Sequence, residues 1–194
     1  MRSQKLQPQI LDAEVEILVS ASQRGDSAAF GKIYDFFVSP IYRYLYYRVG
    51  SAEAEDLTEL VFLKTWENIR SYRQANRRFS AWLFRIAHNV VIDFYRSNHF
   101  QGILSEDLPD LRREANSREL AHRHFDQQLL SQAMKELKDH YRQILILKYM
   151  NDLSNEEIGQ IMGRSQAALR ILQYRALKSL KRTLENMGIS DLEA

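Results

Sequence analysis

The sequence predicts an all-α protein with two small helical domains joined by a flexible linker, the second domain containing a helix-turn-helix. Apolar residues recur at steps of three and four along almost the whole chain, and only seven Gly and three Pro interrupt 194 residues. Between Asn98 and Asp126 this periodicity weakens and charges of both signs mix. We therefore place the first domain at residues 1–98, the linker at 99–126 and the second domain at 127–194.

Four helices are expected in the first domain, separated by short breaks. The apolar spacing places them around residues 11–23, 30–49, 51–66 and 79–96. Gly25 and Asp26 break the first from the second, which Pro40 is expected to kink or divide. Gly50 ends the second helix, and Ser51 is expected to cap the third, whose first turn is acidic.

Composition excludes several classes of protein. The chain has no Cys, which rules out disulfides, a thiolate nucleophile and Cys-ligated zinc or iron–sulfur sites. Its five His form no pair with metal-ligand spacing on a helix, so we expect no metal, no cofactor and no enzymatic activity. The N-terminus resembles no secretory signal and no apolar run could span a bilayer, which predicts a cytoplasmic protein without membrane insertion.

The net charge of +2 is small, but the charges are unevenly distributed. Residues 68–92 hold five Arg and no acid, and residues 164–184 hold six basic residues and no acid. Two such windows in separate domains are typical of two surfaces for a polyanion. Solvated helix faces are the alternative for either window alone.

The second domain carries a helix-turn-helix pattern. Ser154 and Glu157 form a capping box, Gly163 supplies the turn, and Ser165 can cap the next helix. That helix has an inner apolar stripe, and at 100° per residue Arg170, Tyr174, Lys178 and Lys181 point the opposite way, with Gln166 and Arg175 at the edges. The pattern favours insertion into the major groove. A helical hairpin with a basic surface is the alternative.

The first domain carries a different pattern, in which aromatic and Arg residues alternate between Arg70 and Arg96. Arginines that neutralise phosphates beside rings that stack on bases are typical of a single-strand binding surface. Each ring taken alone is better explained as part of the core.

These motifs resemble the bacterial RNA polymerase sigma factors of the two-domain, extracytoplasmic-function type, which are sigma-70-like. In the first domain the resemblance rests on GDSAAF (25–30), AEDL (54–57), FLKTW (62–66) and FSAWLFRIAHN (79–89). In the second it rests on Leu153-Ser154 through Gly159, Met162-Gly163, Arg175-Ala176-Leu177 and Leu180.

The resemblance implies a function and a set of site residues. A sigma factor directs core polymerase to specific promoters and assists promoter opening. By position, the core-binding residues would be Asp56, Glu59, Phe62, Leu63 and Trp66. The −10 single strand would be bound by Tyr72, Arg73, Asn76, Arg77, Arg78, Phe79, Trp82, Arg85 and Asn89. The −35 duplex would be read by Gln166, Arg170, Tyr174, Arg175 and Lys178. The implied partners are RNA polymerase core, promoter DNA and an anti-sigma factor.

Two departures from the family pattern bear on these roles. Glu59-Leu60 stands where the core-binding helix of the family usually has Gln and an acid. In the recognition helix a Lys-Ser-Arg run is common, whereas this chain has Arg170-Ile171-Leu172, so promoter preference does not transfer.

The alternative function is a helix-turn-helix regulator that acts on duplex DNA without being a polymerase subunit. The alternating aromatic and Arg residues favour the sigma factor, because a protein that binds only duplex DNA has no use for a single-strand surface.

Overall fold

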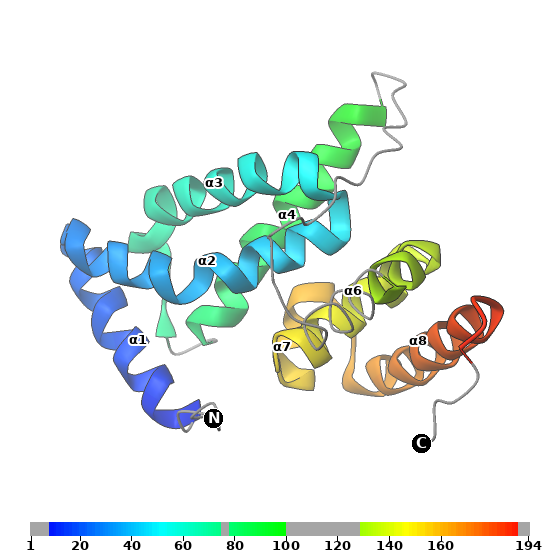
Figure 1. The fold of residues 1–194 in the computed structure, drawn as a ribbon. Helices are drawn as coiled ribbons and strands as arrows, with labels where there is room; N and C mark the ends of the chain where they lie inside the picture. Colours follow the sequence, from blue (N-terminus) through cyan, green and yellow to red (C-terminus); the bar gives the residue numbers. More distant parts are fainter. Residues whose placement is uncertain (1–7, 75–77, 100–128, 190–194) are drawn as a thin grey trace, which may run out of the picture. The chain divides into compact units, whose positions relative to one another are not determined.

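The computed structural model describes residues 8–74, 78–99 and 129–189 (Figure 1). Contacts divide the chain into two compact units, residues 1–45 with 54–104 and residues 46–53 with 105–194. Both units are helical, and no strand occurs in the described ranges. The predicted all-α fold with two helical domains is confirmed. The linker expected over 99–126 lies outside the described residues, apart from His99.

Helices α1 (Pro8–Gln23), α2 (Ser27–Val49), α3 (Ser51–Asn68) and α4 (Phe79–His99) correspond to the four helices expected in the N-terminal half. A 3₁₀ turn, η1 (Ile69–Ser71), follows α3. In Figure 1, α3 runs alongside α2, and α4 crosses behind them. Ile33, Leu83 and Val91 are among the fully buried side chains that fill the space between these helices. Burial of this apolar surface stabilises the unit.

Glycines end two of these elements as expected. Gly25 has φ 95° and Gly50 has φ 96°, conformations that L side chains rarely adopt. Asp26 then caps α2, because its Oδ1 accepts a hydrogen bond from the Ala29 amide at 3.0 Å.

Two local expectations need correction. Pro40 does not divide α2, which continues as one helix to Val49. The predicted cap by Ser51 is wrong. Helix α3 begins at Ser51 itself, and the buried Oγ of this serine has no hydrogen-bond partner in the described part of the chain.

The second unit contains a helical segment over 129–136, then α6 (Asp139–Leu145), α7 (Asn155–Met162) and α8 (Gln166–Asn186). Helix α6 continues into one π-helical turn, η3 (Ile146–Met150). Ile144, Leu147, Ile158 and Leu169 are completely buried between these elements. Helix α8 packs against both α6 and α7, which leaves its opposite face exposed.

None of the helices in the described ranges combines the length and apolarity needed to cross a membrane.

Candidate nucleic-acid interfaces

The start of α7 is fixed by the predicted capping box. The Glu157 amide donates to Ser154 Oγ at 3.2 Å, and the Ser154 amide donates to Glu157 Oε2 at 2.8 Å. Leu153 and Ile158, on either side of the box, are buried. Two otherwise unpaired amides are satisfied in this way, so the first helix of the motif has a defined start and direction.

The turn between α7 and α8 depends on two glycines. Gly163 takes the left-handed conformation at φ 65°, as predicted. A Cβ at Gly159 would lie 2.9 Å from the backbone carbonyl oxygen of Arg164. The next nearest group is a side-chain carbon of Leu169 on α8, at 3.6 Å, so Gly159 lies where the turn and α8 both come close to α7. Together the glycines let the chain reverse tightly enough for α8 to pack on α7.

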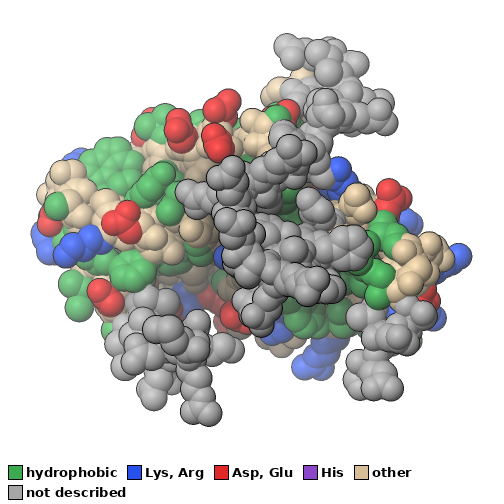
Figure 2. Space-filling model, viewed as in Figure 1, with side chains coloured by type: hydrophobic (Ala, Val, Ile, Leu, Met, Phe, Trp, Pro, Cys, Tyr) green, Lys and Arg blue, Asp and Glu red, His purple; other side chains and the backbone are tan. Residues whose placement is uncertain are grey.

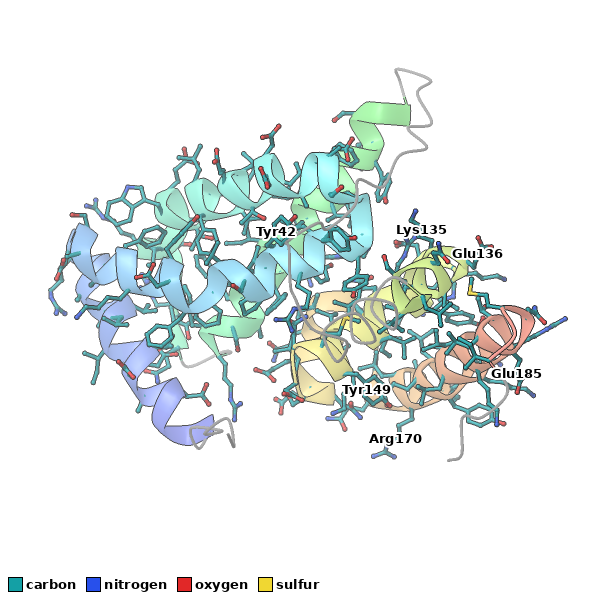
Figure 3. The ribbon with its side chains drawn as sticks, in the orientation of Figure 1. Tyr42, Lys135, Glu136, Tyr149, Arg170 and Glu185 are labelled. Carbon is teal, nitrogen blue, oxygen red and sulfur yellow. The ribbon has the colours of Figure 1, made fainter. Side chains whose placement is uncertain are left out.

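Helix α8 has a buried apolar stripe and an exposed face that carries its basic residues. Leu169, Leu172 and Ala176 are buried, and Ser165 caps the helix by accepting from the Ala168 amide at 3.3 Å. All five residues predicted to read duplex DNA are exposed: Gln166, Arg170, Tyr174, Arg175 and Lys178. In Figure 3, Arg170 points away from the body of its unit. The helix therefore presents a basic surface to solvent, as the predicted role of a recognition helix requires.

The segment that leads into α4 contains a cluster of aromatic rings. Tyr72, Phe79 and Trp82 lie with ring centroids 5.4–5.5 Å apart, and Phe37 of α2 lies 5.7 Å from Phe79. Tyr72 is 3% exposed and Phe79 is 1% exposed, whereas Trp82 is half-buried. Of these three predicted site residues, Trp82 is the one with an accessible ring.

Helix α1 holds this segment in place. Tyr72 donates its hydroxyl to Glu16 Oε1 at 2.7 Å, and Gln23 Nε2 donates to the carbonyls of Ile69 and Tyr72, each at 2.9 Å. Arg78 forms a salt bridge of 3.3 Å with Asp12. A cavity of about 420 Å³ opens beside these contacts, lined by α1 together with Phe37, Arg78 and Phe79.

The other residues predicted for the single-strand surface differ in their exposure and contacts. Arg73 is exposed and donates to the carbonyl of Arg70 at 2.7 Å, which keeps its side chain near its own turn. Arg85 is half-buried and Asn89 is exposed, both on α4. Asn76 and Arg77 lie outside the described residues.

Helix α3 presents a mixed acidic and apolar surface. Asp56 and Glu59 are exposed, and Leu63 is 55% exposed. Phe62 is buried against Tyr34 of α2, with ring centroids 4.7 Å apart, and the partly exposed Trp66 lies 4.9 Å from Phe30. Figure 2 shows acidic side chains gathered along α3, with hydrophobic side chains towards its end. An exposed Leu and Trp beside carboxylates are typical of a protein-binding surface.

Comparison with known proteins identifies both halves of the chain. A family model for Sigma-70 region 2 matches residues 33–100, and one for Sigma-70, region 4 matches residues 127–180. The ECF RNA polymerase sigma factor SigM of Bacillus subtilis is 31% identical over 161 residues, which cover 82% of this chain and 97% of SigM. The chain belongs to the ECF sigma factors of RNA polymerase. BldN of Streptomyces coelicolor, which is named as an ECF RNA polymerase sigma factor, is 34% identical over 170 residues. The matched region covers 86% of this chain but only 64% of the length of BldN.

Solved structures show the same fold. The sigma factor RpoE of Bartonella quintana, crystallised with the anti-sigma factor NepR, matches with a TM-score of 0.69 at 20% identity. The match covers 80% of this chain and 96% of RpoE. CnrH, solved with the cytosolic domain of CnrY, also gives 0.69, at 21% identity, with 89% of this chain and 98% of CnrH covered.

Sequence reasoning missed the part that α1 plays. Asp12, Glu16 and Gln23 contact the segment before α4 from positions 46 to 66 residues away. No local pattern indicates such contacts. The one available signal is that Asp12 and Glu16 stand four residues apart and therefore share a helix face.

Proposed function

We propose that this sigma factor contacts polymerase and promoter through three separate surfaces. Helix α3 binds core through Asp56, Glu59, Phe62, Leu63 and Trp66. The segment from Tyr72 to Asn89 binds the non-template strand of the −10 element. Helix α8 reads the −35 duplex. In this role the chain catalyses no reaction of its own and acts in the cytoplasm, where its polymerase is.

The observation that carries the assignment of α8 is the pattern of burial along it. Residues at the inner positions are packed on α6 and α7, whereas Arg170, Tyr174 and Lys178 are exposed on the far side and Gln166 and Arg175 are exposed at its edges. Arg is the side chain that most often reads guanine in the major groove, by two hydrogen bonds to its edge. Lys178 lies two turns after Arg170 and suits a backbone phosphate.

For the −10 strand, the division between buried and exposed residues supports a division of roles. Trp82 and the Arg side chains contact the strand, while Tyr72 and Phe79 pack against the ring of Trp82. The neighbouring cavity of about 420 Å³ takes a flipped base. Tyr72 and Phe79 therefore contribute to DNA binding through the position of Trp82, and Phe79 also lines the cavity.

An anti-sigma factor is the remaining partner that we propose. It would cover the α3 surface, where Leu63 and Trp66 are exposed beside acidic side chains, and so would compete with core polymerase. Fold similarity to the sigma factor RpoE, which was solved with the anti-sigma factor NepR, supports this partner without identifying it.

Transcription by purified core polymerase, with and without this protein, on a genomic promoter library tests the proposal. We expect initiation at a new set of start sites and co-purification of the chain with core. The Arg170→Ala substitution should weaken holoenzyme binding to the −35 duplex by about 1–3 kcal/mol if Arg170 reads a base, and by less if it contacts only phosphate. Absence of both new initiation and co-purification would overturn the proposal.

The regulator that acts on duplex DNA without polymerase is not favoured, because both halves of the chain match sigma-70 regions.

A further inference from the structure

The exposed face of α8 carries an apolar row among its polar residues. Ala167 and Ile171 are both exposed, and Ile171 keeps 55% of its surface accessible. At 100° per residue, Ile171 projects about 60° from Tyr174, on the opposite side of it from Arg170. Ile171 therefore shares the outward face with the predicted DNA-reading residues, and Ala167 precedes it by one turn on the same line.

Packing within the protein does not explain this isoleucine. Leu169, Leu172 and Ala176 already supply the buried stripe that holds α8 to the rest of its unit. An isoleucine side chain gains free energy only when water is removed from it, and it offers no hydrogen bond to a phosphate or a base edge. Its position is also informative, because Ile171 is the sixth residue of α8. The N-terminal part of a recognition helix is the part that meets base edges.

The major groove contains one apolar group with which such a side chain can pack. Thymine presents its C5-methyl group there, whereas the other bases present hydrogen-bond donors and acceptors at their edges. Ile171 stands where a serine is common in the family, and a serine hydroxyl can bond to either kind of edge. Isoleucine in place of serine loses the hydroxyl and gains an apolar side chain, which favours a base that presents a methyl group over one that presents only hydrogen-bonding groups.

We propose that Ile171, with Ala167 one turn before it, contacts a thymine methyl group in the −35 duplex and makes that thymine a determinant of promoter choice. This inference rests on the proposed function, since it requires α8 to enter the groove of duplex DNA. It adds a base preference that Arg170 alone does not specify.

Deoxyuridine provides the sharpest test, because uracil differs from thymine only by the absence of the C5-methyl group. Holoenzyme formed from core and the full chain first selects duplexes from a library randomised upstream of the −10 element. Each thymidine in a selected −35 region is then replaced singly by deoxyuridine. At one position we expect binding to weaken about fourfold, the equivalent of about 0.8 kcal/mol for one buried methyl group.

The Ile171→Ala variant should bind the thymidine and deoxyuridine duplexes equally, and should bind the thymidine duplex more weakly than the parent does. Leu177→Ala is the matched control, since Leu177 is also an exposed apolar residue of α8 but lies six residues further along. This control should keep the fourfold ratio. Circular dichroism should show unchanged helix content in both variants, because neither side chain is buried.

Two results would overturn the inference: equal binding of thymidine and deoxyuridine duplexes by the parent at every position, or a ratio that Ile171→Ala leaves intact. If Arg170→Ala still weakens binding in those cases, α8 reads the duplex and only the methyl contact is wrong. If no upstream duplex is selected and Arg170→Ala has no effect, the proposed function of α8 fails as well.

Discussion

Helix α8 and the segment before α4 are both rich in basic residues, yet their side chains differ in availability. Within the described residues, no hydrogen bond or salt bridge engages the side chains of Arg170, Arg175 or Lys178. In the first unit, Arg78 is paired with Asp12, Arg73 is bonded to its own turn, and the rings of Tyr72 and Phe79 are buried. The basic side chains of α8 are exposed to solvent without an internal hydrogen bond or salt bridge in the described residues, whereas those of Arg73 and Arg78 before α4 make contacts within the protein.

The difference fits the two kinds of DNA that we propose as targets of these surfaces. Duplex DNA is a regular target, so a rigid helix with exposed side chains can bind it without rearrangement. Binding a melted strand requires contacts that replace base stacking, and rings provide them. Because some of the rings in the first unit also form its core, changes there should affect stability and DNA binding together, whereas changes on the outer face of α8 should separate them.

The largest effect on stability is expected from Phe79→Ala. Phe79 is almost fully buried against Phe37, Tyr72 and Trp82, and its truncation should destabilise the first unit by about 3–5 kcal/mol. Urea denaturation followed by circular dichroism measures this loss. Arg170→Ala, which alters an exposed side chain, is the control and should change stability by less than about 0.5 kcal/mol. Equal stabilities of the two variants would show that the ring cluster is not part of the core.

The sequence predicts the second unit better than the first, for a physical reason. The capping box at Ser154, the turn at Gly163 and the stripe from Leu169 to Ala176 are local, so a few neighbouring residues determine each of them. The environment of Tyr72 and Phe79 depends on helices α1 and α2, which are distant in sequence. Their alternation with Arg indicates a binding surface, but burial can be decided only by tertiary packing.

The second largest effect on stability is expected from Gly159→Ala, and Gly31→Ala provides the comparison. Alanine at Gly159 would place its Cβ 2.9 Å from the Arg164 carbonyl, so Gly159→Ala should destabilise the second unit by about 1–3 kcal/mol and weaken duplex binding. Gly31 lies in α2 with no atom within 4 Å of the added Cβ. Gly31→Ala should therefore stabilise the first unit, by about 0.5–1 kcal/mol, through helix propensity alone. Changes of the same sign in thermal unfolding would contradict the close approach at Gly159.

A smaller loss of stability is expected when either of the two serine caps of the helix-turn-helix is removed. Ser154→Ala removes the hydroxyl acceptor of a reciprocal pair of hydrogen bonds and should cost about 1 kcal/mol or more. Ser165→Ala removes a single exposed bond of 3.3 Å and should cost less. Guanidinium denaturation of the two variants provides the comparison, and a larger loss for Ser165→Ala would mean that the capping box does not define the motif.

The smallest effect on stability is expected from Asp12→Asn. This substitution tests most directly whether internal contacts of the segment before α4 reduce its affinity for single-stranded DNA. The Asp12 and Arg78 side chains are 40% and 58% exposed, so their salt bridge contributes between zero and about 1 kcal/mol to folding. Removing the carboxylate releases Arg78 for a phosphate and removes a repelling charge. We expect holoenzyme containing Asp12→Asn to bind a −10 single strand about two- to fivefold more tightly at low salt, with the gain shrinking as salt screens the charges. Glu14→Gln removes an exposed charge two residues away on the same helix and is the control. A gain of equal size in both variants would mean that net charge, and not the release of Arg78, sets the affinity.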